Sequence, residues 1–114
     1  MCIQYDYFQG VLGGLFEWCG NHVLELNDEE LIGVIYEEYM YCSTDLYEDN
    51  IKSFLQLGFI TDEIAEKMRQ IYKLSNEMLS DGQERSAHII RNSPTWKKIF
   101  DLTDEIKAKI KLYF

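Results

Sequence analysis

The stretch of sequence that decides the fold is SPTWKKIFDLTDEIKAKIKLYF, residues 93–114. It opens with Ser93, a good helix cap, followed by Pro94 at the position that becomes the first residue of the helix. Apolar or small side chains then recur every three or four residues, as they do along one face of an α-helix. This face carries Trp96, Ile99, Thr103, Ile106, Ile110 and Tyr113. The segment is therefore predicted to be an amphipathic helix that reaches the C-terminus and turns this face toward a core.

Residues 3–19 are predicted to form a helix that is buried around much of its circumference. They are almost entirely apolar, and only Asp6 and Glu17 are charged. Two apolar rows run along the segment at helical spacing, namely Ile3, Tyr7, Val11 and Leu15, and beside them Phe8, Leu12 and Phe16. Gly10, Gly13 and Gly14 weaken this prediction, because each costs about 1 kcal/mol relative to alanine inside a helix. These glycines indicate either close helix packing or a break in the helix.

A capped helix is predicted from Asp28 to about Tyr41. Asn27 precedes three acids, and Glu30 stands where it completes a capping box with the asparagine. The predicted buried stripe consists of Leu31, Ile32, Ile35, Tyr36, Tyr39 and Met40. The opposite side of this helix is predicted to carry Glu30, Gly33, Glu37 and Tyr41.

Two more helices are predicted before residue 83. The first is capped by Ser43, Thr44 or Asp45 and runs to Leu57, where Gly58 ends it and Phe59 makes the accompanying apolar contact. The second begins at Thr61-Asp62-Glu63, ends at Asp81-Gly82, and buries Ile64, Met68, Ile71, Ser75 and Met78. Residues 83–92 fit either a short helix or an irregular connection. The chain is therefore predicted to be an all-α, single-domain bundle of five to six helices with short connections, spanning residues 1–114.

Charge is distributed very unevenly along the chain. The formal net charge is -9, yet residues 1–51 hold eleven acids and no Lys or Arg, and nine of those acids fall within residues 25–49. A surface this acidic repels phosphate backbones, so nucleic-acid binding is not expected. An acidic surface that only keeps the protein soluble is one interpretation. The absence of any base before Lys52 favours the other interpretation, a surface that binds a basic partner.

Candidate partner-binding residues lie in this acidic region and include two tyrosines. Tyrosine is common in interface hot spots, because it brings a large contact area at low entropic cost. Tyr36 and Tyr39 have the helical phase of core residues, whereas Tyr41 falls on the acidic face and Tyr47 is undecided. The candidate set is Glu29, Glu30, Glu37, Glu38, Tyr41, Asp45, Tyr47, Glu48 and Asp49.

No pattern for catalysis, metal or cofactor binding is present in the sequence. Cys19 and His22 form one loose pair of possible metal ligands, and Cys42 and His88 lie far away in the sequence. A structural zinc site usually has two pairs of ligands that are each close together in the sequence. Neither histidine follows a glutamate by three residues, as a di-iron bundle requires. The glycines do not have the spacing of a phosphate-binding loop. We therefore expect no enzyme activity, no cofactor and no metal site.

The C-terminal half of the chain resembles the immunity proteins of bacterial contact-dependent growth inhibition and related toxin–immunity systems. The resemblance lies in Gly58-Phe59-Ile60-Thr61, in Asn92-Ser93-Pro94-Thr95-Trp96-Lys97-Lys98-Ile99 and in Asp104-Glu105-Ile106. These residues are caps and core positions, so the resemblance transfers no functional residue. It implies a role, which is to bind a cognate toxin domain, a nuclease above all, and to cover its active site or substrate surface.

The expected protein is thus a cytoplasmic inhibitor that binds one basic toxin domain in a 1:1 complex. The lack of a basic N-terminal leader, of a long apolar run and of an even number of cysteines leads us to expect the cytoplasm, with no membrane partner. The alternative is a helical homodimer or regulatory subunit that assembles through its apolar first helix. A hydrophobic dimer has no need of the concentrated negative charge, which favours the first interpretation.

Overall fold

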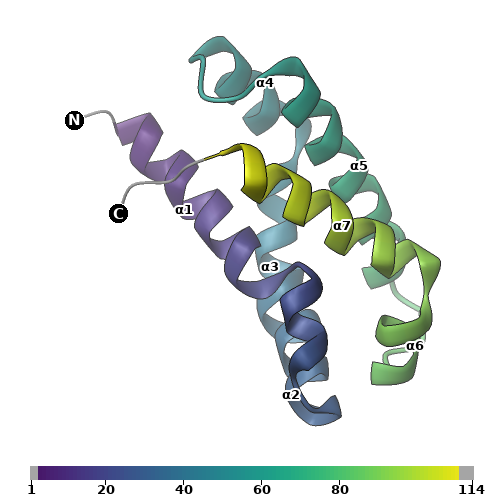
Figure 1. Ribbon diagram of the computed structural model, residues 1–114. Helices are drawn as coiled ribbons and strands as arrows, with labels where there is room; N and C mark the ends of the chain where they lie inside the picture. Colours follow the sequence, from purple (N-terminus) through teal and green to yellow (C-terminus); the bar gives the residue numbers. More distant parts are fainter. Residues whose placement is uncertain (1–2, 111–114) are drawn as a thin grey trace.

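The helix α7 (Pro94–Lys109) begins at Ser93, as the sequence predicts. In the computed structural model, which describes residues 3–110 (Figure 1), the Ser93 hydroxyl accepts hydrogen bonds from the amides of Thr95 and Trp96 at 3.2 and 3.3 Å. The predicted face of α7 is buried at Trp96, Ile99, Thr103 and Ile106. The helix ends earlier than predicted, because Ile110 has an extended backbone. Tyr113, the last member of the predicted face, lies outside the described residues.

The helix α1 (Ile3–Trp18) is continuous through its glycines. Phe8, Val11, Leu12, Leu15 and Phe16 are buried, so both predicted apolar rows reach the core. The prediction that Tyr7 is part of that core is wrong, because 48% of its surface is exposed. At Gly14 the helices approach closely, since a Cβ at this position would stand 3.1 Å from the Cys42 sulfur. The glycine therefore allows close packing rather than a break.

Residues 28–43 form one continuous helical run, made of α2 (Asp28–Gly33), the π-helical segment η2 (Val34–Tyr39) and α3 (Met40–Ser43). The predicted capping box is present, with the Glu30 amide donating to the Asn27 side chain at 2.8 Å and the Asn27 amide donating to the Glu30 carboxylate at 3.3 Å.

The π-helical segment was not predicted, and it alters the face that is buried. Its hydrogen bonds join residues five apart, as from the Met40 amide to the Ile35 carbonyl. One turn of this segment therefore contains more residues than a turn of an α-helix. Side chains four residues apart consequently lie almost along one line parallel to the helix axis. Leu31, Ile35 and Tyr39 lie on that line and are fully buried. The predicted burial of Ile32 is wrong, since 37% of this side chain is exposed.

The start of α4 (Glu48–Gln56) differs from the prediction. The hydroxyls of Ser43 and Thr44 donate to the preceding carbonyls of Met40 and Tyr41 at 3.0 and 2.7 Å, so they end one helix instead of starting the next. A 3-10 turn, η3 (Thr44–Leu46), follows, and Tyr47 occupies the N-cap position without a side-chain cap.

The end of α4 is as predicted. Gly58 has φ +76°, its amide donates to the Leu55 carbonyl at 3.1 Å, and the Phe59 amide donates to the Phe54 carbonyl at 2.9 Å. These two bonds form a Schellman motif, which satisfies the last carbonyls of the helix. The Phe59 ring then packs on Phe8 of α1, with the ring centroids 5.2 Å apart.

The remaining helices each begin at a hydroxyl cap. Thr61 caps α5 (Asp62–Leu79) and Ser86 caps α6 (Ala87–Asn92), so a short helix is the correct alternative for residues 83–92. A 3-10 turn, η1 (Asn21–Glu25), joins α1 to α2.

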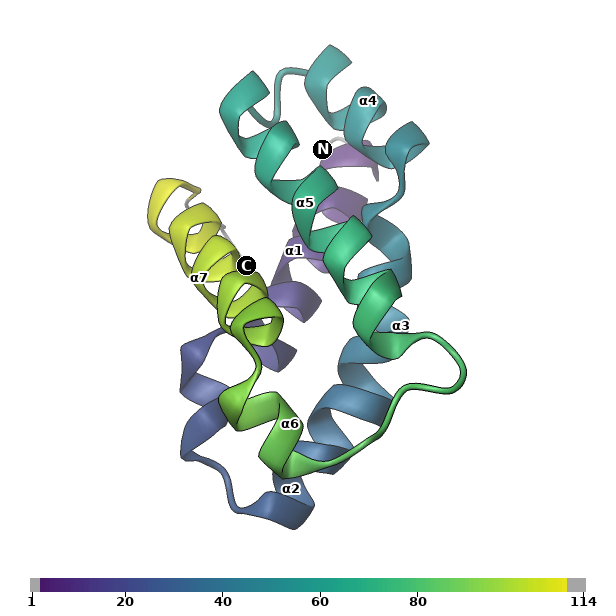
Figure 2. The same ribbon diagram turned by 90° about the vertical axis from the view of Figure 1, so that its right-hand side faces the viewer.

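These elements make an all-α bundle, and residues 3–110 contain no strand. The chain descends along α1, returns through the run from α2 to α3, and descends again along α5, with α7 packed beside α5 (Figures 1 and 2). In the centre, the Trp96 ring meets Tyr39 edge to face and stacks on Phe100, with ring centroids 6.1 and 5.6 Å apart. No helix within the described part of the chain has both the length and the apolar character needed to cross a membrane.

Candidate functional site

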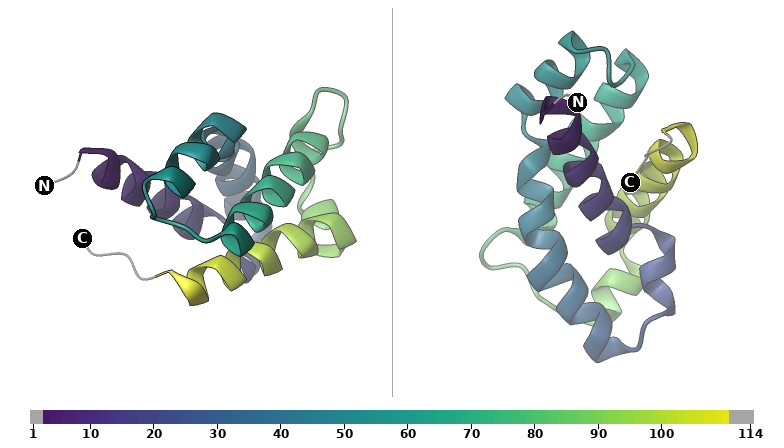
Figure 3. Two further views of the ribbon diagram at one scale, coloured as in Figure 1. Left: turned by 90° about the horizontal axis from the view of Figure 1, so that it is seen from above. Right: turned by 90° about the vertical axis from the view of Figure 1, so that its left-hand side faces the viewer.

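The predicted binding residues lie on the outer side of the run from α2 to α3 and on the first turn of α4. Figure 3 shows this run beside α1 on one face of the molecule, with α4 at one end. The side chains of Glu29, Glu30, Glu37, Glu38, Glu48 and Asp49 are exposed, and Asp45 is half-buried. Tyr41 and Tyr47 are also accessible, with 74% and 41% of their surfaces exposed. The candidate set therefore forms part of the surface and contributes nothing to the core.

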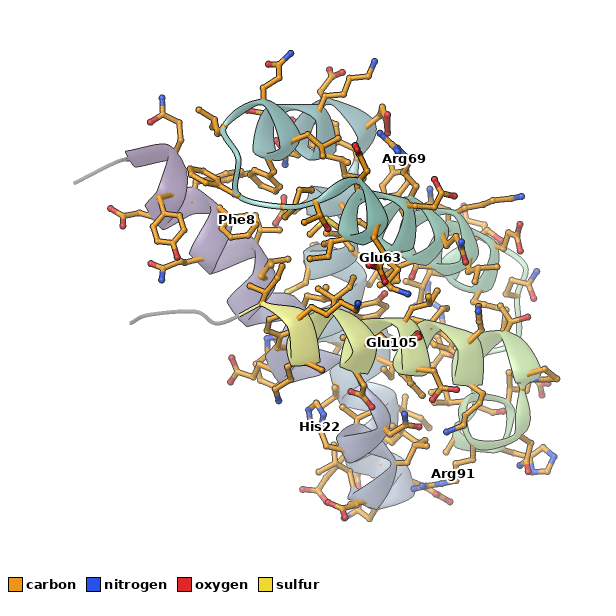
Figure 4. The ribbon with its side chains drawn as sticks, turned by 45° about the horizontal axis from the view of Figure 1, so that its top comes forward. Phe8, His22, Glu63, Arg69, Arg91 and Glu105 are labelled. Carbon is orange, nitrogen blue, oxygen red and sulfur yellow. The ribbon has the colours of Figure 1, made fainter. Side chains whose placement is uncertain are left out.

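The structure neutralises part of this acidic surface, contrary to the uncompensated charge expected from the sequence. Arg69 of α5 donates from Nε to both carboxylate oxygens of Glu48, at 2.9 and 3.1 Å. Arg91 of α6 donates to Asp28 at 3.0 Å and to the carbonyls of Leu24 and Leu26 at 2.7 and 2.6 Å. Figure 4 labels both arginines, Arg69 beside α4 and Arg91 beside α2. The second half of the chain thus supplies counter-charges to the first.

These contacts separate the candidate acids into two classes. Glu48 is engaged, and the hydrogen bond from Arg69 lowers the pKa of its carboxyl group. Glu30 is engaged as well, through the capping box with Asn27. Among residues 3–110, the acids that form no ion pair include Glu29, Glu37, Glu38, Asp45 and Asp49. These carboxylates remain available to a partner.

Negative charges from three elements, α1, η2 and η3, act on Cys42. Burial raises the pKa of this thiol, and the negative charges of Asp45, Glu38 and Glu17 raise it further. Glu17 belongs to α1, and Gly14 of the same helix lies against the Cys42 sulfur. The acidic surface therefore extends from η2 and η3 onto α1, which the sequence did not reveal.

The tyrosines also divide between core and surface. The core assignment of Tyr36 and Tyr39 is correct, since they are 5% and 0% exposed. Tyr7 is a surface residue that the candidate set lacks, and its hydroxyl accepts a hydrogen bond from the Asn50 amide of α4 at 2.9 Å. Its helical spacing with Val11 and Leu15 suggested burial, and no local signal distinguished it from them.

A second polar cluster joins η1 to α7. The Asn21 side-chain amide donates to Asp101 and Asp104 at 2.9 and 2.8 Å, and Lys97 donates to the Asn21 side-chain oxygen at 2.9 Å. Hydrogen bonds from Asn21 and Lys97 lower the pKa of the Asp101 carboxyl group. Gly20 precedes the cluster at φ +122°, and a Cβ there would stand 2.6 Å from an Asp104 oxygen. The polar groups satisfy one another, so the cluster holds the turn against the helix.

A surface hollow next to this cluster offers little to a small molecule. It is lined by Lys98, Asp101, Asp104, Glu105 and Ala108. Ligand pockets are lined mainly by apolar and aromatic side chains, whereas here a single alanine faces four charged residues. Neither the hollow nor the cluster has the composition of a small-molecule site.

The cysteines and histidines considered above as metal ligands lie in different surroundings. Cys19 is buried against the Thr103 hydroxyl at 3.2 Å, and burial raises its pKa to about 12. The His22 ring donates to the Glu17 carbonyl at 3.0 Å, and His88 lies on α6 beside Asn92. Within the described residues, no three His, Cys, Asp or Glu side chains are placed to hold a metal ion.

The chain matches no protein-family model, no curated protein and no solved structure.

Proposed function

We propose that this protein is an immunity protein, which binds a basic toxin domain and neutralises it by covering its active site or substrate surface. The observation that carries the proposal is a set of exposed carboxylates, Glu37 and Glu38 of η2 and Asp49 of α4, which form no ion pair within residues 3–110, together with the 74% exposed ring of Tyr41. Unpaired charges beside an exposed aromatic ring are typical of a binding surface, where the ring supplies contact area and the charges supply complementarity.

The proposed mechanism is inhibition by charge mimicry. An enzyme that cleaves nucleic acid holds phosphates with cationic side chains, and carboxylates on a rigid helix present negative charge to the same groups. The field of an acidic surface also speeds encounter, and steered association reaches about 10⁸–10⁹ M⁻¹s⁻¹ at low salt. The protein itself performs no catalysis in this mechanism, and it acts in the cytoplasm, where a nuclease toxin finds its substrate.

The alternative, a homodimer assembled through the first helix, lacks an available apolar surface. Phe8, Val11, Leu12, Leu15 and Phe16 of α1 are already buried inside the chain. Among the described side chains of α1, Tyr7 is the exposed ring, Tyr5 and Trp18 are half-buried against the core, and Gly10 and Glu17 also lie on the exposed side. These observations favour a heterologous partner.

The test looks for a toxin domain encoded directly upstream of this chain's gene and expresses it with the chain. Co-expression with the full chain is expected to restore growth, and the two proteins are expected to copurify in a 1:1 complex. Replacing Glu37 and Glu38 together by lysine should weaken binding about tenfold or more and reduce its dependence on salt. The matched control changes Glu77, near the end of α5, and Asp81, in the turn that follows, to lysine, which alters the net charge equally. No growth protection by the unaltered chain would contradict the proposed function.

A further inference from the structure

Three of the large apolar side chains most exposed to solvent are tyrosines from three different segments. Tyr7 of α1, Tyr41 of α3 and Tyr47 before α4 are 48%, 74% and 41% exposed. The tyrosines of the core are covered by the chain, whereas these three rings are covered only in part by residues 3–110. We call Tyr7, Tyr41 and Tyr47 the tyrosine surface.

Hydrogen bonds from Asn50 hold two parts of this surface together. The side-chain amide of Asn50 donates to the Tyr7 hydroxyl at 2.9 Å and to the Asp45 carbonyl at 2.8 Å. The same amide thus ties α1 to the turn that carries Tyr47. Tyr41 lies one turn before Asp45, and the Thr44 hydroxyl binds the Tyr41 carbonyl at 2.7 Å. The positions of the three tyrosines are therefore set by the fold before any partner binds.

Three carboxylates without an ion pair act on Cys42, the residue that follows Tyr41 in the chain. Glu17 of α1, Glu38 of η2 and Asp45 of η3 form no ion pair within residues 3–110, and all three act on the Cys42 thiol between the helices. In contrast, Glu48 beside Tyr47 is bound by Arg69. Free negative charge is therefore concentrated where α1 meets α3.

The charge identifies the kind of partner that fits. A second copy of this chain would carry the same net charge of -9 and would place Glu17, Glu38 and Asp45 against their own equivalents. Like charges brought together at an interface are unfavourable, and so is a phosphate backbone on this surface. An arginine-rich or lysine-rich protein segment satisfies the carboxylates, and arginine also stacks on tyrosine rings.

We propose that the tyrosine surface is the contact site for an arginine-bearing segment of the partner, and that α1 contributes to the interface through Tyr7 and Glu17. This inference rests on the proposed function and makes it narrower. The three rings act as the anchors of the interface, Glu38 and Asp45 bind the partner's guanidinium groups, and Glu29, Glu30 and Glu48 of the original candidate set lie outside the contact.

The test titrates the isotope-labelled full chain with a short polyarginine peptide and follows backbone amide signals by NMR. Changes are expected to centre on residues 7, 17, 38, 41, 45 and 47. Replacing Tyr41 and Tyr47 by alanine leaves the charge unchanged, yet it should weaken peptide binding about tenfold, as loss of interface anchors does. The matched control is Leu57→Ala, which removes an apolar side chain of similar exposure, 43%, from the other end of α4. It should leave the affinity unchanged.

The same variants are then measured with the upstream toxin domain, so that the two proposals can fail separately. A toxin that binds the unaltered chain and the tyrosine variant equally well would overturn this inference and leave the proposed function standing. A toxin that binds neither the unaltered chain nor the tyrosine variant would contradict the proposed function. In that case the peptide titration still tests whether the tyrosine surface binds an arginine-rich segment. Signal changes centred on Glu29 or on α5, or equal peptide affinity for the tyrosine variant, would also overturn it.

Discussion

The Tyr39 hydroxyl lies 2.6 Å from the Ser75 hydroxyl in the centre of the bundle, where both residues are fully buried. This contact joins the π-helical segment η2 to α5 across thirty-six positions of sequence. A buried hydroxyl that loses its partner carries its desolvation cost into the folded state. The pair therefore stabilises the position of η2 within the bundle, and with it the adjacent Glu37 and Glu38.

Tyr39→Phe is expected to lower the free energy of unfolding by about 1–3 kcal/mol, because it leaves the Ser75 hydroxyl buried without this partner. Urea unfolding followed by circular dichroism measures the change. The double variant Tyr39→Phe with Ser75→Ala should cost less than the two single changes added together. Strict additivity would mean that the two hydroxyls do not interact.

Ile106→Ala is expected to lower the free energy of unfolding by about 2–5 kcal/mol, since a fully buried side chain leaves a cavity. Ile106 is 0% exposed on α7. The exposed neighbour supplies the control, and Lys107→Ala should change stability by less than about 0.5 kcal/mol. A small effect at both positions would show that the face of α7 is not core, contrary to the fold described above.

Two glycine substitutions are expected to have opposite effects on stability. Gly20→Ala should destabilise the protein by about 1–3 kcal/mol, because φ is +122° and the new Cβ would meet Asp104 at 2.6 Å. Gly10→Ala should raise stability by about 0.5–1 kcal/mol, because this glycine lies inside α1 and a Cβ there meets nothing within 4 Å. Thermal melts of the two variants compare them directly. A neutral Gly20→Ala would argue against the close approach of η1 to α7.

Asn21→Ala is expected to raise the pKa of Asp101 toward its ordinary value, because the Asn21 amide is the largest cause of its lowering. A carboxyl group with a lowered folded-state pKa contributes stability above its unfolded pKa and loses that contribution as the pH falls through the folded pKa. Acid unfolding should therefore begin at a higher pH in the variant. NMR titration of the Asp101 carboxyl carbon measures the pKa, and Asn76→Ala, an exposed change on α5, should leave it unaltered.

Local signals in the sequence were sufficient for most of the helix boundaries. Ser93, Thr61 and Asn27 cap the helices that were predicted to follow them, and Gly58 ends α4 in the predicted way. These signals work because a cap bonds to amides two or three residues away, and because apolar spacing reports one helix face at a time. Among the wrong assignments, those at Ser43, Thr44 and Ile32 concern residues whose local pattern fits two structures equally well.

The candidate surface was only partly predictable for a different reason. Its acids and Tyr41 were evident from charge and helical phase, which depend on neighbours in the sequence. The pairing of Arg91 with Asp28 and of Arg69 with Glu48 joins residues sixty-three and twenty-one positions apart. Whether Tyr7 points inward or outward likewise depends on what α4 places beside it.

The sequence by itself determined an all-α chain, the ends of most helices and the concentration of acids in the first half. Only the tertiary structure decided which of those acids remain unpaired and which tyrosines stay exposed. The physical reason is that caps and helix faces arise from hydrogen bonds and contacts within one or two turns. Charge pairing and exposure arise from the packing of helices that are distant in the sequence. This packing brings basic residues of α5 and α6 to some acids and leaves the acids near the junction of α1 and α3 without a counter-charge.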